Sequence, residues 1–136
     1  MNVLHGDVEY SLPTEWWVAA DMQHFRPDRD AFRVDRTGTN LPVIEVALND
    51  VEPCRRKLSH GVFNDCPPLT AQERVARILR AFREDTPLPP IDLVRTERDE
   101  GPRFRLYHGV HRFCCAMFAG FTLVPAMDVT DELKKI

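Results

Sequence analysis

Gly109, His111 and Arg112 form a short Gly-x-His-Arg sequence whose two polar side chains can donate hydrogen bonds to a ligand. They stand at the start of a helix that the apolar pattern predicts over residues 110–119. The N-terminus of a helix carries free amide donors and about half a positive charge, so Asp or Glu usually stands there. Here a histidine and an arginine take that place, and no acidic residue occurs in residues 101–127. This mismatch between side chain and helix dipole indicates a functional site.

A bound anion would remove the mismatch. Gly109 lets the backbone approach a ligand closely, and the first amides of the helix point toward it. Arg112 can donate two parallel hydrogen bonds to phosphate oxygens, and His111 adds a further donor. The alternative is that Arg112 pairs with a carboxylate from elsewhere in the fold while His111 caps a carbonyl. Because the Gly-x-His-Arg pattern is short and also occurs by chance, both readings stay open; we favour a phosphate-binding turn.

Length and composition predict one compact domain. The 136 residues with 43% hydrophobic content suffice for a single core. The formal net charge of −3 repels a nucleic-acid backbone, so any DNA contact would be local. No apolar stretch reaches the roughly 20 residues of a membrane-spanning helix, and no secretory signal is recognisable. We therefore expect a cytoplasmic protein without membrane contact.

Local patterns predict an α+β fold with a small mixed sheet that presents the turn. The clearest helix begins with the capping box Thr70-Ala71-Gln72-Glu73 and continues with an apolar stripe from Val75 to Phe82. Its four arginines are interpreted as a solvated face, because acidic residues flank them. The helix at 110–119 should end at Gly120. Strands are expected over residues 42–48, 90–94, 104–107 and 122–127.

The cysteines do not indicate a metal site. They show no C-x-x-C spacing, and the two adjacent ones would point about 100° apart on a helix. We interpret them as reduced thiols that pack as small hydrophobic residues. They are Cys54, Cys66, Cys114 and Cys115.

The order of the motifs resembles that of the ParB/sulfiredoxin superfamily, which includes the ParB-like nuclease domain, over about residues 43–129. The matching segments are Asp50-Val51-Glu52-Pro53-x-Arg55-Arg56, Leu88-Pro89-Pro90-Ile91, Tyr107-His108-Gly109-Val110-His111-Arg112-Phe113 and Gly120-Phe121-x-x-Val124-Pro125-Ala126. The resemblance implies a compact domain that binds nucleotide phosphates at a strand-Gly-x-His-Arg-helix turn. Members include segregation proteins that bind and hydrolyse CTP, sulfiredoxin, which uses ATP, kinases for free serine, and proteins described as nucleases.

The resemblance also implies which residues would bind a nucleotide. Gly109, His111 and Arg112 would hold the phosphates of ATP or CTP, with Mg²⁺ bridging them. Arg55 or Arg56 would contact the γ-phosphate or the base. The expected function is therefore nucleotide binding, with NTP hydrolysis or transfer of phosphate to a small molecule as the reaction.

A reaction of this kind needs a carboxylate, and the resemblance points to Glu52 or Asp50 as general base or metal contact. Asp65 is a weaker candidate, because a loop Asx turn explains it better. The His-Glu-Glu run of the serine kinases is absent. Sulfiredoxin activity is not expected, because Val110 occupies the position of the catalytic cysteine.

Two other functions stay open. The domain could be a non-catalytic module that senses a nucleotide or binds a protein, or it could be a ParB-like nuclease. Sequence-specific DNA binding is not expected, because no helix-turn-helix domain follows the matching region.

The start of the resemblance at residue 43 predicts a domain over residues 43–136 and an N-terminal extension, residues 1–42, packed on it. A short helix is expected over residues 14–22, with its first threonine as the cap. Trp16 and Trp17 on this helix would face different ways, so one of them could contact a protein partner.

Overall fold

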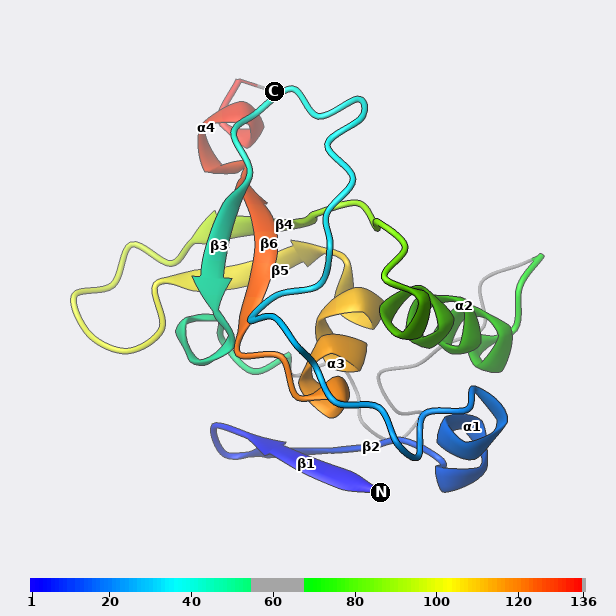
Figure 1. The fold of residues 1–136 in the computed structure, drawn as a ribbon. Coiled ribbons are helices and arrows are strands. Elements are labelled where there is room, and N and C mark those ends of the chain that lie inside the picture. The colour runs from blue at the N-terminus through cyan, green and yellow to red at the C-terminus, as the bar shows by residue number, and fades with distance from the viewer. Residues whose placement is uncertain (55–67, 136) are drawn as a thin grey trace.

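A four-stranded mixed sheet forms the centre of the computed structural model, which describes residues 1–54 and 68–135 (Figure 1). The parallel pair β4 and β6 lies in the middle, and each pairs on its other side with an antiparallel neighbour. In spatial order the strands are β3 (Ile44–Ala47), β6 (Leu123–Asp128), β4 (Ile91–Arg95) and β5 (Phe104–His108). The expected α+β fold with a small mixed sheet is confirmed.

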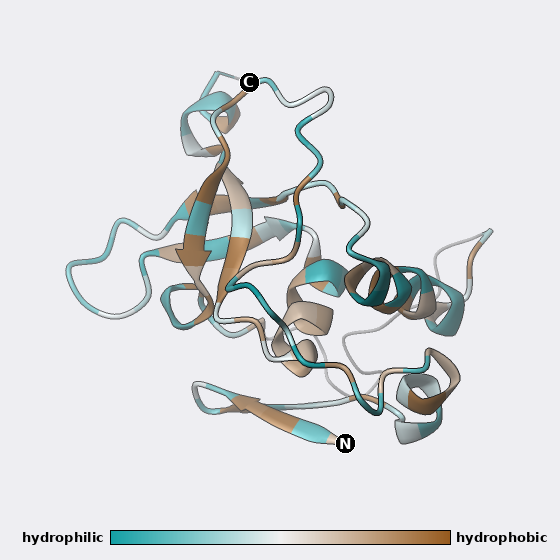
Figure 2. Ribbon diagram, in the orientation of Figure 1, coloured by the Kyte–Doolittle hydropathy of each residue, from teal (hydrophilic) through white to brown (hydrophobic). Residues whose placement is uncertain are grey.

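Helix α2 (Ala71–Glu84) begins at the predicted capping box. The Thr70 hydroxyl accepts a hydrogen bond from the Glu73 amide at 3.1 Å, and the Glu73 carboxylate accepts one from the Thr70 amide at 3.3 Å. The apolar stripe from Val75 to Phe82 is buried, and Figure 2 shows hydrophilic and hydrophobic residues alternating along this helix. Helix α2 therefore packs its apolar face on the core and on α3.

Helix α3 (Val110–Ala119) follows β5 directly and ends, as predicted, at Gly120 in a left-handed conformation. Figure 2 shows its hydrophilic residues near the start and a hydrophobic remainder. Cys114 and Cys115 are fully buried there, as expected of thiols that pack as hydrophobic residues, and Cys54 is half-buried. Cys66 lies outside the described residues.

The N-terminal residues share the core of the rest of the chain. A hairpin that the sequence did not predict comes first, formed by β1 (Asn2–His5) and β2 (Val8–Ser11). Helix α1 (Thr14–Ala19) then packs on α2, with both tryptophans half-buried against the core. The prediction that Thr14 caps this helix was wrong, because Pro13 occupies the N-cap position and no side chain caps the helix.

Two short elements complete the fold. A 3₁₀ turn η1 (Leu48–Asp50) follows β3, and α4 (Thr130–Leu133) follows β6. Among the described residues, no helix combines the length and apolarity needed to cross a membrane.

The two threonines that the sequence suggested as caps give a stability test. We expect Thr70→Ala to lower the free energy of unfolding by about 1 kcal/mol, because α2 loses the hydroxyl that satisfies its Glu73 amide. Thr14→Ala should change it by less than about 0.5 kcal/mol, since this exposed hydroxyl makes no cap bond and accepts only an exposed hydrogen bond from the N-terminal amine at 3.2 Å. Urea unfolding of both variants measures the difference, and equal losses would contradict the capping assignment.

Candidate functional site

Gly109 is the N-cap residue of α3 and adopts a φ of 102°, in the left-handed region. A Cβ atom at this position would lie 2.6 Å from Cγ2 and 2.9 Å from Cβ of Ile91 in β4. Glycine is therefore required both by the backbone conformation and by the close approach of the turn to the sheet. The Gly109 carbonyl accepts the first helical hydrogen bond from the Phe113 amide at 2.9 Å.

Arg112 leaves the first turn of α3 and lies half-buried. Its Nη2 donates to the Pro90 carbonyl at 3.1 Å, while its buried Nε has no hydrogen-bond partner among the described residues. Burial lowers the pKa of this guanidinium; the nearby Asp92 carboxylate opposes the shift and the Arg74 guanidinium adds to it. Arg112 therefore has an attracting carboxylate nearby, but the described residues hold no direct ion pair of Arg112.

Arg74 is a site residue that sequence analysis missed. It is half-buried at the start of α2, and its Nε is also buried, with no hydrogen-bond partner within residues 1–54 and 68–135. The interpretation of the arginines of α2 as a solvated face holds for the exposed Arg80 and Arg83 but not for Arg74. The sequence did contain a signal for Arg74. It is a cation just after the capping box, near a helix N-terminus where the dipole disfavours positive charge.

Arg74 and Arg112 line one cavity of about 780 Å³ between α2 and the β5–α3 turn, here called the arginine cavity. Among its described lining residues no carboxylate occurs. The side chains that can carry positive charge are Arg74, Arg77, His108, His111 and Arg112. The predicted turn residues Gly109, His111 and Arg112 are thus brought together, and arginines from a second helix join them.

Asp50 and Glu52 lie elsewhere. Asp50 accepts hydrogen bonds from the Arg103 side chain at 2.5 Å and from its amide at 3.0 Å, and Glu52 forms an ion pair with Arg98. Neither carboxylate lines the arginine cavity.

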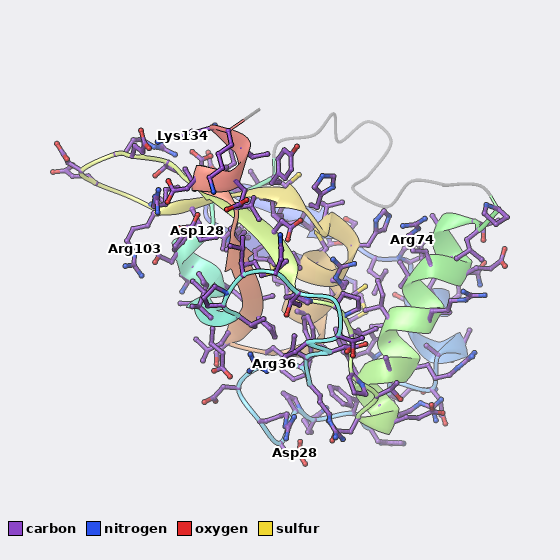
Figure 3. The ribbon with its side chains drawn as sticks, turned by 90° about the horizontal axis from the view of Figure 1, so that it is seen from above. Asp28, Arg36, Arg74, Arg103, Asp128 and Lys134 are labelled. Atoms are coloured by element: carbon purple, nitrogen blue, oxygen red, sulfur yellow. The ribbon has the colours of Figure 1, made fainter. Side chains whose placement is uncertain are left out.

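Their position along the sheet accounts for this separation. The Glu52 amide donates to the Phe104 carbonyl at the start of β5, whereas Gly109 follows the end of that strand. The length of β5, about 13 Å at roughly 3.3 Å per residue, separates the two ends. Figure 3 shows Arg103 and Arg74 on opposite sides of the molecule.

Arg55, Arg56 and Asp65 lie outside the described residues. Cys54, just before them, does line the arginine cavity.

Comparisons with known proteins add little to this geometry. No known protein family and no curated protein matches the sequence. Among solved structures, sulfiredoxin from Arabidopsis thaliana is similar with 18% sequence identity and a TM-score of 0.45, covering 69% of this chain and 93% of that chain. Membership of the ParB/sulfiredoxin superfamily stays a prediction.

Two glycine variants test the close approach at the turn. We expect Gly101→Ala to cost about 1–2 kcal/mol of stability, because its φ is +83° but no atom lies within 4 Å of the added methyl group. Gly109→Ala should cost about 1–3 kcal/mol more, since its methyl group collides with Ile91. Chemical denaturation compares them. Equal losses of stability in the two variants would mean that the turn relaxes around the added methyl group. The contact between Gly109 and Ile91 would then be unimportant.

Proposed function

We propose that the protein binds the phosphates of a nucleotide, ATP or CTP, in the arginine cavity. The observation that carries the proposal is the pair Arg74 and Arg112. Two guanidinium groups from different helices line one cavity, and each keeps a buried Nε that has no hydrogen-bond partner in the described part of the chain. A buried donor without a partner costs about 1–3 kcal/mol, so an anion that accepts from both would recover this loss.

The electrostatics of the cavity favour the same ligand. Burial is the main cause of the lowered pKa of Arg112; repulsion by the Arg74 guanidinium adds to this shift, and the attraction of the Asp92 carboxylate opposes it. A phosphate group would offset this repulsion and accept the two-pronged hydrogen bonds that arginine donates. The amides at the start of α3 would add the helix dipole. His111 lines the cavity and can donate as well.

The apolar part of the cavity supports a nucleotide over free phosphate. Its wall includes Leu69, Leu88 and Leu106, and its volume lies in the range of about 300–1,000 Å³ usual for small-molecule sites. Tyr107 also lines it, is 47% exposed and packs edge-on against the His108 ring. An exposed aromatic ring beside cations offers a surface on which a base can stack. Mg²⁺ would enter on the phosphates of the nucleotide.

A second candidate is a nucleotide-binding module without chemistry. It is favoured by the ion pairs that engage Asp50 and Glu52 and by their distance from the arginine cavity. Phosphotransfer or hydrolysis with either carboxylate as base stays a prediction from the family resemblance. The nuclease alternative rests on that resemblance alone, and the net charge of −3 argues against it.

Thermal-shift measurements test the binding proposal. ATP, CTP and pyrophosphate, each with and without Mg²⁺, should raise the Tm of the wild type, because a ligand at one hundred times its Kd stabilises the folded state by about 2.7 kcal/mol. Arg112→Ala and Arg74→Ala should abolish most of this rise. Arg80→Ala is the matched control, since Arg80 is exposed on the same helix outside the cavity. Absence of any shift in the wild type would overturn the proposal.

Phosphate release separates the enzyme from the module. If Glu52 is the general base, the wild type should hydrolyse its nucleotide, and Glu52→Gln should slow this by about 10²–10⁴-fold, the usual contribution of general acid–base catalysis. If the protein is a non-catalytic module, neither the wild type nor Glu52→Gln should release phosphate above the background, although both should bind the nucleotide. Arg98→Ala also tests Glu52 as the base, because this substitution removes the ion pair that engages the Glu52 carboxylate.

A further inference from the structure

The N-terminal hairpin, formed by β1 and β2, contacts a wall of the arginine cavity through Tyr10. The Tyr10 hydroxyl donates to the Cys54 carbonyl at 2.9 Å, and Cys54 lines the cavity. Tyr10 is 1% exposed, so its ring is anchored in the core while its hydroxyl reaches the end of the segment that follows η1. The hairpin therefore fixes the backbone at the point where this segment meets the cavity.

His5 connects the hairpin to two further parts of the site. Its Nε2 lies 2.7 Å from the Val51 carbonyl, and because a carbonyl only accepts, Nε2 carries the proton and donates. The same ring packs edge-on against Phe113, with 5.5 Å between the ring centroids. Phe113 follows Arg112 in α3. One buried histidine thus contacts both the segment that leads to Cys54 and the helix turn that carries Arg112.

Gly6 at the tip of the hairpin gives a third contact. A Cβ atom there would lie 2.8 Å from Cγ of Pro53, so the hairpin backbone packs closely on this proline. The contacts of these three hairpin residues fall within residues 51–54 and 113. None of the hairpin residues belongs to the region that resembles the ParB/sulfiredoxin superfamily.

We infer that the hairpin positions two walls of the arginine cavity, with Tyr10 and His5 as positioning residues for phosphate binding. This inference rests on the proposed function. The hairpin touches no ligand. It holds Cys54 and the first turn of α3 in the positions that phosphate binding requires. Ordering a segment when the ligand binds costs affinity, and contacts that order it beforehand reduce this cost.

Four variants test the inference, with pyrophosphate as the probe and titration calorimetry as the measurement. Tyr10→Phe keeps the ring and removes the hydroxyl, and His5→Leu removes the donor to Val51. Each should weaken pyrophosphate binding by about three- to tenfold, which corresponds to the net contribution of one hydrogen bond. His5→Gln should restore most of the affinity, because its amide can donate to the same carbonyl. Leu4→Ala, on the exposed face of β1, should bind like the wild type.

The outcomes distinguish positioning from packing. Kd is compared with the free energy of unfolding of each variant, at a temperature where all of them are folded. Lower stability with an unchanged Kd in both Tyr10→Phe and His5→Leu would overturn the inference and reduce the hairpin to a structural element. Failure of His5→Gln to bind better than His5→Leu would overturn the role of His5. If His5→Leu does not fold, Tyr10→Phe decides alone.

The proposed function fails separately. If the wild type does not bind pyrophosphate or a nucleotide, the binding proposal falls and this inference falls with it. If the wild type binds and Arg112→Ala does not, but the hairpin variants keep wild-type affinity, only the inference is overturned.

Discussion

The contact between Gly109 and Ile91 determines where the site stands relative to the sheet. Because the backbone of the β5–α3 turn packs directly on the Ile91 side chain of β4, the start of α3 lies against the central strands. The same strand begins just after Pro90, whose carbonyl accepts the hydrogen bond from Arg112. A single strand thus fixes both the backbone of the turn and the guanidinium that leaves it. The rigid support that a binding site needs comes from the sheet.

Two half-buried cations without an ion pair among the described residues distinguish the arginine cavity. Several arginines elsewhere in the described chain have partners of opposite charge, as Arg95 does with Asp128 and Asp131 or Arg103 with Asp50. Exposed pairs of that kind contribute little to stability, about 0–1 kcal/mol. Two half-buried guanidinium groups that line one cavity are less unfavourable when an anion is present. Their repulsion is therefore also the basis of the proposed preference for a phosphate ligand.

The features that could be predicted from the sequence depend on neighbours in the chain. The capping box of α2, the glycine that ends α3 and the strand that precedes Gly109 are all set by local spacing and backbone preference. The N-terminal hairpin was missed, because its strands have only four residues each. The ion pairs of Asp50 and Glu52 could not be foreseen either. Their partners come from the β4–β5 connection, and only the folded sheet brings them near.

The antiparallel pairing of β3 with β6 has a consequence for how the protein folds. Ile44 pairs with Ala126, so the sheet joins segments from the first and last thirds of the chain, and His5 reaches Val51 across 46 residues. Such distant contacts are slow to form, because loop-closure entropy is lost before they stabilise the structure. Local elements such as α2 can form early, whereas the sheet is complete only when β3 and β4 have paired with β6. The sheet on which the Gly109 turn packs is therefore finished only after β6 has been made.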